Sequence, residues 1–286
     1  MSEQWPGRPD AWQQPATFSA PAPLVRVPPR RRRSALPTLL VVLLLTLAAF
    51  AVLRWALPDV LRGGPPAGLE EQALPIGAPP LGAPATGPYS FMQTQEDGVT
   101  PVTYSPCRPI HYVVRPDGAP TGGDTLVASA FAQISQATGL RFVADGPTSE
   151  RPSPEREAYQ PDRYGRRWAP VLVVWSHPEE TPDLAGDVAG HAGSSSVTVD
   201  DGPAHYVTGS VVLDGPAIGA LLTSPNGTAV AQGVVTHEVA HLVGLGHVDD
   251  PGQLMNPTAA LNQTYLGNGD LAGLAKAGTG PCAPEL

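Results

Sequence analysis

Apolar residues form one uninterrupted run near the start of the chain and shorter, patterned segments beyond it. The run covers residues 34–53, SALPTLLVVLLLTLAAFAVL, and contains no charged side chain. As a helix it would be about 30 Å long, at about 1.5 Å per residue, which matches the hydrocarbon core of a bilayer. Because every face of this helix is apolar, we predict a transmembrane signal anchor rather than a helix of a globular core.

The charges beside this run predict its orientation. Arg30 to Arg33 precede it, so the positive-inside rule places the N-terminus in the cytoplasm and the rest of the chain in the extracellular space. A cleaved signal peptide is the alternative, because Ala49-Phe50-Ala51 resembles a cleavage site, and cleavage would give a secreted protein. The length of the run and the 33 residues ahead of it favour the uncleaved anchor.

Beyond residue 102, apolar positions alternate between strand spacing and helix spacing. Strands are predicted at 109–115, 140–144, 171–175, 188–197 and 206–214. Helices are predicted at 124–138, at 271–277, and from a start between 224 and 228 to about 243. The expected caps are Asp124 and Asp270, and the expected ends are Gly139 and Gly278. Segment 171–175, VLVVW, has no polar face and should be buried on both sides. We therefore predict one α+β domain over 102–286.

Proline and glycine are frequent, at 35 and 31 of 286 residues, against roughly 12% together in an average chain. Many lie in residues 54–101, which predicts an extended linker that holds the domain off the membrane. Residues 1–33, rich in Pro, Gln and Arg, predict a disordered basic tail. No G-x-y period runs through the chain, which excludes collagen.

The net charge of −9 is unevenly distributed. Residues 1–33 carry six arginines against two acidic side chains, whereas residues 63–286 carry nine basic side chains against 23 acidic ones. Aromatic residues make up only 6% of the chain, so binding of nucleic acid by base stacking is not predicted.

The candidate metal ligands and the candidate catalytic residue lie together in HEVAHLVGLGH, residues 237–247. On a helix, His237 and His241 lie one turn apart on the same face and can offer two imidazole nitrogens to one metal. Gly244 lets the chain leave the helix, so that His247 can return as a third ligand. Three nitrogen ligands with one open corner are the pattern of a catalytic Zn²⁺. Glu238 is turned away from the histidine pair and is placed to act as general base on a water molecule, which predicts peptide hydrolysis.

This motif resembles the metzincin zinc signature HExxHxxGxxH. Leu254-Met255-Asn256-Pro257 is similar to the methionine turn of the matrixin branch, with Met255 beneath the metal. The resemblance implies a metzincin-like catalytic domain with a twisted mixed sheet, an active-site helix and a C-terminal helix. It also implies a protein or peptide substrate that pairs with an exposed sheet edge near 188–196. The inhibitory PRCGxPD motif of matrixin zymogens does not occur in the sequence.

Matrixins also hold a structural zinc with three histidines and one acid, and His177, Glu179, His191 and His205 resemble that series. The resemblance implies a second structural Zn²⁺ here, and the alternative is that these are solvated loop residues. Aspartates in the loops offer oxygen ligands that could instead hold Ca²⁺.

Two cysteines, Cys107 and Cys282, lie near the two ends of the predicted domain. Their even number and the predicted extracellular location favour a disulfide between them. Two unrelated buried thiols are the alternative.

These patterns together predict a membrane-anchored extracellular zinc endopeptidase. A non-catalytic cell-surface binding module on the same fold is the alternative, and a substitution at Glu238 or at a ligand would favour it. All four residues are intact. An intramembrane protease would need the motif inside a bundle of spans, yet it lies about 180 residues beyond the apolar run.

Overall fold

The computed structural model describes residue 46, residues 64–257 and residues 263–286. The predicted tail, 1–33, and the predicted anchor, 34–53, lie outside the described residues apart from Thr46. Within the described ranges, no helix has both the length and the apolar character needed to cross a bilayer. The chain divides into two units, 1–52 and 53–286, and the second unit contains the sheet and its helices.

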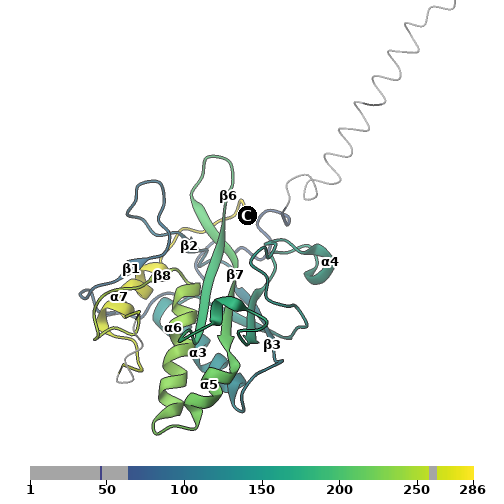
Figure 1. The fold of residues 1–286 in the computed structure, drawn as a ribbon. Coiled ribbons are helices and arrows are strands. Elements are labelled where there is room, and N and C mark those ends of the chain that lie inside the picture. Colours follow the sequence, from purple (N-terminus) through teal and green to yellow (C-terminus); the bar gives the residue numbers. More distant parts are fainter. Residues whose placement is uncertain (1–45, 47–63, 258–262) are drawn as a thin grey trace, which may run out of the picture. The chain divides into compact units, whose positions relative to one another are not determined.

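A six-stranded mixed sheet forms the centre of this unit (Figure 1). Its strands are β2 (Thr103–Tyr104), β3 (Ile110–Arg115), β4 (Phe142–Pro147), β5 (Val171–Ser176), β6 (Gly190–Thr198) and β7 (Ala204–Asp214). The order is β2-β7-β5-β3-β4, and β6 pairs with β7. The β6–β7 pair is antiparallel and the other pairs are parallel. The predicted mixed sheet is confirmed, and β6, which overlaps most of the predicted segment 188–196, is one of its edge strands.

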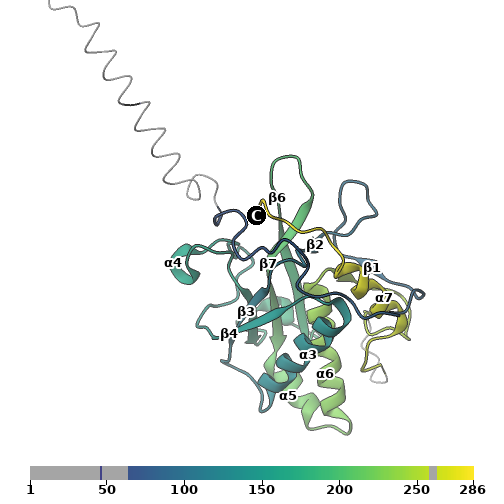
Figure 2. The ribbon, with the colours of Figure 1, turned by 180° about the vertical axis from the view of Figure 1, so that it is seen from behind.

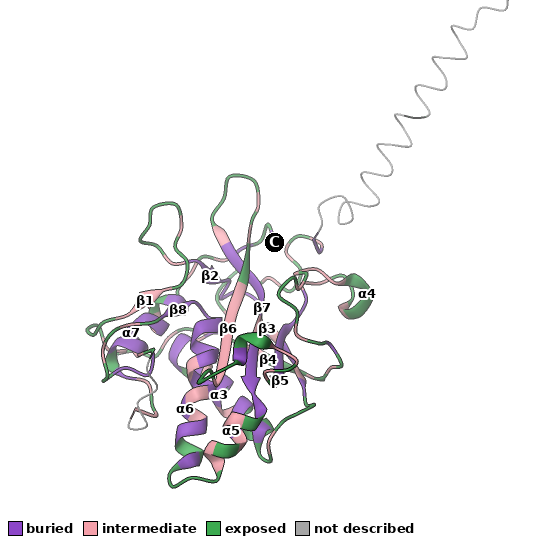
Figure 3. Ribbon diagram, viewed as in Figure 1, coloured by how far each residue is buried: buried purple, intermediate pink, exposed green. Residues whose placement is uncertain are grey.

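The central strand β5 is buried along its whole length, as its apolar sequence predicts. Val171, Val173 and Trp175 face the main core, whereas Leu172 and Val174 pack with Val113 on the opposite face. Strand β7 is also largely buried, while the edge strand β6 is partly exposed (Figure 3).

The main helices lie on one face of the sheet, where α3 and α6 are neighbours (Figure 2). The helices are α3 (Gly123–Thr138), α4 (Pro161–Tyr164), α5 (Gly215–Leu222), α6 (Gly227–Leu242) and α7 (Asn268–Ala277), with a 3₁₀ turn η1 (Pro182–Leu184). All three predicted helices are present. Helix α5 was not predicted, because its segment GPAIGALL has no polar face to reveal a helical period.

The helix ends confirm part of the predicted capping. Gly139 ends α3 in the left-handed conformation, with φ 76°. Asp124 lies inside the first turn of α3 instead of at its cap, which is Gly122. Asp270 is the third residue of α7, and its Oδ2 accepts a hydrogen bond from Gly267 N at 2.8 Å. It therefore caps α7 from within the helix rather than from the position before it.

The predicted linker, 54–101, is not a free spacer over its described part. We call residues 64–101 the docked segment, because it lies against the domain. Gly68 N donates to Leu286 O at 2.7 Å, and Gln72 N donates to Cys107 O at 2.7 Å. Strand β1 (Ser90–Phe91) pairs antiparallel with β8 (Leu245–Gly246). The domain thus begins before the predicted boundary at 102, since a proline-rich backbone can satisfy its hydrogen bonds on neighbouring elements.

The predicted disulfide between Cys107 and Cys282 is present, with a Cα–Cα distance of 5.3 Å. It joins the residues after β2 to the C-terminal residues of the sequence. The buried carboxylate of Glu71, on the docked segment, accepts from Ala283 N at 2.6 Å beside it.

Candidate metal centre and catalytic cleft

Helix α6 and the turn after it carry the zinc motif. The helix presents His237 and His241 one turn apart and ends at Leu242. Gly244 follows with φ +103°, a conformation that favours glycine, and a Cβ there would lie 3.0 Å from Tyr206 Cε2. The chain then reverses through β8 and brings His247 back over the helix, as predicted.

The three histidines offer one converging set of nitrogen atoms. His247 Nε2 lies 3.1 Å from His237 Nε2 and 3.0 Å from His241 Nε2. Tetrahedral nitrogen ligands at zinc distances of about 2.0–2.1 Å would be about 3.3 Å apart, which is close to these separations. Three nitrogen lone pairs repel one another unless a cation lies between them. The donor set therefore fits Zn²⁺.

Two of the histidines are held in the tautomer that a metal ligand needs. His237 Nδ1 donates to Leu254 O and His241 Nδ1 donates to Leu245 O, each at 2.7 Å. These bonds leave Nε2 of each ring as the acceptor. Burial lowers the pKa of His237 to about 4 and the pKa of His241 to about 4. Both rings are therefore neutral at pH 7 and need not lose a proton to bind a metal.

Glu238 lies beside the triad but outside it. Its side chain is 6% exposed, and its Oε2 has no hydrogen-bond partner among the described residues. Burial raises the pKa of Glu238 to about 8. A cation at the histidines would favour the charged form and lower that pKa. The geometry leaves this carboxylate free to bond a water molecule or a substrate group.

Met255 is buried, at 1% exposure. Val248 N donates to Met255 O at 3.0 Å, and this bond ties the turn to the segment after His247. Asp270 supports this turn, a contact that no local sequence pattern reveals. Its carboxylate accepts from Leu254 N at 2.6 Å and from Met255 N at 3.4 Å. Burial raises the pKa of Asp270, although these backbone donors oppose the rise.

A cavity of about 510 Å³ opens over the triad and Glu238. The edge strand contributes Gly190 and His191 to its lining, α6 contributes Val230 and Val234, and Leu254 and Pro257 lie on a further side. A Cβ at Gly190 would lie 2.9 Å from Glu238 Cγ and 3.0 Å from Val212 O. Glycine at this position thus leaves the space that the Glu238 side chain occupies, which sequence patterns did not reveal.

The residues predicted for a second zinc are not brought together. His177 and Glu179 form an exposed pair, with Nδ1 and Oε2 2.8 Å apart. His191 and His205 lie toward opposite ends of the β6–β7 hairpin, because His191 pairs with Val212 and His205 with Val197. Among the described residues, only the histidine triad and Glu71 with the two disulfide cysteines are spaced for a metal. The structure thus forms neither the predicted second zinc site nor an acidic calcium cluster within those residues.

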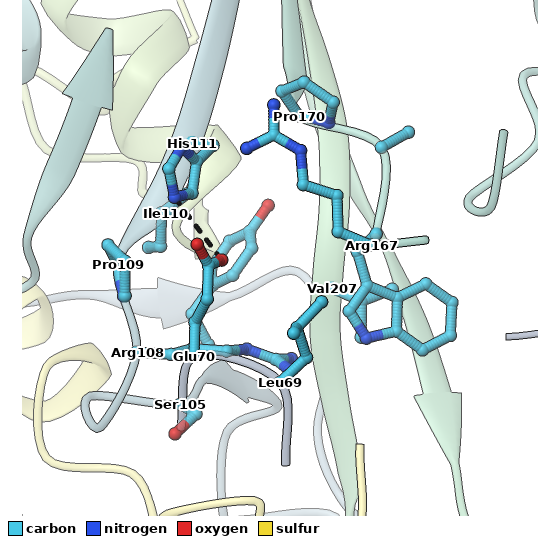
Figure 4. A pocket seen from close by; sticks show the side chains of 13 residues that line it. Leu69, Glu70, Ser105, Arg108, Pro109, Ile110, His111, Arg167, Pro170 and Val207 are labelled. Carbon is cyan, nitrogen blue, oxygen red and sulfur yellow. Dashed lines mark ion pairs between the residues drawn. The ribbon is translucent and has the colours of Figure 1, made fainter. Parts of the chain in front are cut away.

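A second, smaller pocket holds paired charges (Figure 4). His111 Nε2 lies 3.4 Å from Glu70 Oε2, and its Nδ1 lies 2.8 Å from Asp145 Oδ1. Arg167 also binds Asp145. Glu70 belongs to the docked segment, so its contact with His111 helps to attach that segment to β3.

Residues 180–277 match the family model of the matrixins. This match covers the edge strand, α6, the ligands and α7, and it confirms the resemblance to the matrixin branch of the metzincin zinc metallopeptidases. No curated protein sequence matches the chain. Chains of solved structures match, 62 in number, among them "GM1 bound form of the ECX AB5 holotoxin", with 12% identity and a TM-score of 0.36. That similarity covers 61% of this chain and 81% of the other, and a TM-score this low does not define a shared fold.

Proposed function

We propose that this chain is a zinc-dependent endopeptidase, with His237, His241 and His247 as ligands and Glu238 as general base. One observation carries the proposal: three Nε2 atoms converge in an open cavity beside a buried carboxylate oxygen that has no hydrogen-bond partner in the described part of the chain. The matrixin match of residues 180–277 supports the same class of reaction.

The chemistry that zinc supplies when bound is polarisation of the scissile carbonyl and activation of water for attack. Glu238 Oε2 accepts the proton of the attacking water and passes it to the nitrogen of the leaving amine. The new C–O bond forms first and the C–N bond then breaks; the products are an amine and a carboxylic acid, which ionises by releasing its proton. Burial raises the pKa of Glu238, and a cation bound at the histidines would lower it again, so that the carboxylate is charged and can accept the proton of the attacking water.

The edge strand β6 suggests how a substrate binds. It pairs with β7 on one side only, and its N-terminal residues line the cavity. An extended peptide could add to its free edge by backbone hydrogen bonds, with alternate side chains pointing into the cavity. The substrate would therefore be an unfolded or exposed polypeptide segment.

The test compares the full chain with the variant Glu238→Ala on an unstructured protein substrate. The wild type should cleave it, and a chelator should abolish cleavage. Glu238→Ala should bind zinc with similar affinity and lose at least about a hundredfold in rate, as expected for removal of a general base. Equal rates for the two proteins would reject Glu238 as the base.

We further propose that residues 34–53 anchor the chain in a membrane with the domain outside. The disulfide supports an oxidising location. In intact cells, added protease should digest the domain, and alkaline carbonate should leave the chain in the membrane fraction. Recovery of the domain in the medium, with its N-terminus beyond residue 51, would indicate a cleaved signal peptide instead.

A further inference from the structure

The docked segment passes directly beside the metal centre. Ser90 pairs with Gly246 and Phe91 pairs with Leu245 in the β1–β8 ladder. One residue later, Met92 N donates to Gly244 O at 2.9 Å. Figure 1 shows β1, β8 and α7 together at one side of α6. The backbone from Gly244 to Gly246, which leads to the third histidine, is therefore paired with the docked segment.

Ser90 also contacts the third histidine itself. Its hydroxyl donates to the backbone carbonyl of His247 at 2.7 Å. The approach is close, since a Cβ on Gly246 would lie 2.6 Å from Ser90 Oγ. His237 and His241 are held by α6, whereas His247 is exposed and follows a two-residue strand. A hydrogen bond to His247 thus acts where the site has least support from regular structure.

The segment has its own anchor on α7. The rings of Tyr89 and Phe91 meet edge to face at 5.6 Å, and Lys276 Nζ lies 5.1 Å from the centre of the Tyr89 ring. A Cβ on Gly269 would lie 2.1 Å from Pro88 O, so the backbone runs tightly against α7. Ser90 is therefore held from one side by α7 and reaches His247 on the other.

From these contacts we propose that Ser90 is a positioning residue of the metal site and that the docked segment is part of that site. The inference rests on the proposed function only in taking His247 as a zinc ligand. It predicts that the metal affinity of the chain depends on residues ahead of the zinc-motif domain predicted from the sequence.

The first test measures zinc affinity of the metal-free full chain by competition with a chelator of known affinity. Ser90→Ala should bind zinc about threefold to tenfold more weakly, the range for loss of one hydrogen bond. Ser90→Thr, which keeps the hydroxyl, should restore most of the affinity. Ser196→Ala is the matched control, because its hydroxyl also bonds the docked segment, at Gln93, but no ligand. Wild-type affinity in Ser90→Ala would overturn the proposal.

A second pair of variants separates positioning from general stability. Met92→Pro removes the N–H that bonds Gly244 O, while Met92→Ala keeps it. Zinc affinity should fall in Met92→Pro and remain in Met92→Ala, with similar thermal unfolding of the two metal-free proteins. Equal affinities would contradict the inference. Because affinity is measured without substrate, a chain that shows this pattern yet cleaves nothing would disprove the proposed function and leave the positioning role intact.

Discussion

At the scale of single residues, the site depends on the positions of glycines as much as on the three histidines. Gly190 on the edge strand faces Glu238 with no room for a Cβ, and Gly244 makes the turn toward His247. Oε2 of Glu238 has no hydrogen-bond partner among the described residues, so the position of this side chain depends on how it is packed. A small change in that packing should therefore move the proposed base without touching the three histidines.

Gly190→Ala tests this at one atom. Its Cβ would press on Glu238 Cγ and on Val212 O, and misplacement of the base should lower the cleavage rate by roughly tenfold to a hundredfold. Zinc affinity should remain unchanged. Gly193→Ala is the matched control on the same strand, since nothing lies within 4 Å of a Cβ there. Equal cleavage rates for the two variants would show that the space left by Gly190 is not needed to position Glu238.

Buried ion pairs give a second residue-scale prediction. Burial raises the pKa of Glu150, but hydrogen bonds from Arg156, Tyr164 and Gln160 outweigh it, so the pKa lies below its usual value. A lowered folded-state pKa stabilises the protein above the unfolded-state pKa, and this stability is lost as pH falls through the folded-state value.

Glu150→Gln should therefore lower the melting temperature most near pH 7, and the difference from wild type should shrink below about pH 4. Glu155→Gln, on the same loop but exposed, serves as the control. A difference that grows toward low pH would contradict the sign of this argument.

At the scale of elements, local patterns predicted the parts of the site that one helix provides. The spacing of His237 and His241 defines a helical face, and Gly139 ends α3 as expected. Local patterns did not predict the contacts between elements that lie far apart in the sequence. Nothing local pairs Asp270 with the turn at Met255, and the register of β6 and β7 separates His191 from His205. The composition of the docked segment predicts a linker. Its hydrogen bonds are made to distant elements, and such bonds leave no local pattern in the sequence.

Asp270 links α7 to the methionine turn, and its removal should affect both elements. Asp270→Ala leaves Leu254 N, Met255 N and Gly267 N without their acceptor, at a cost of about 1–3 kcal/mol for each buried group left unpaired. We expect a clear fall in melting temperature and weaker zinc binding. Asp124→Ala, in the first turn of α3 and exposed, should change neither. Wild-type stability in Asp270→Ala would contradict this role.

At the scale of the whole molecule, two distant parts of the sequence close the domain together. The Cys107–Cys282 bond spans 175 residues, and Glu71 of the docked segment bonds Ala283 beside it. The docked segment runs from this closure to the metal centre, where Ser90 meets His247. The docked segment is thus bound both to the C-terminal residues and to the turn that carries His247.

Loss of the disulfide should lower stability without altering the metal site. The chain-entropy model credits a loop of this length with about 5 kcal/mol, an upper value. The double variant Cys107→Ser/Cys282→Ser should unfold at lower denaturant concentration yet bind zinc with wild-type affinity in its folded state. Unchanged stability in the double variant would show that other contacts close the domain.

The proposed function requires one zinc ion at the histidine triad for peptide cleavage. The most direct measurement is the cleavage rate of the metal-free full chain as zinc is added stepwise. We predict a rate that rises from zero to a plateau at one zinc per chain, and none in a His247→Ala variant over the same range. Cleavage without added metal, or a plateau only at two ions per chain, would contradict the proposal of one catalytic zinc ion.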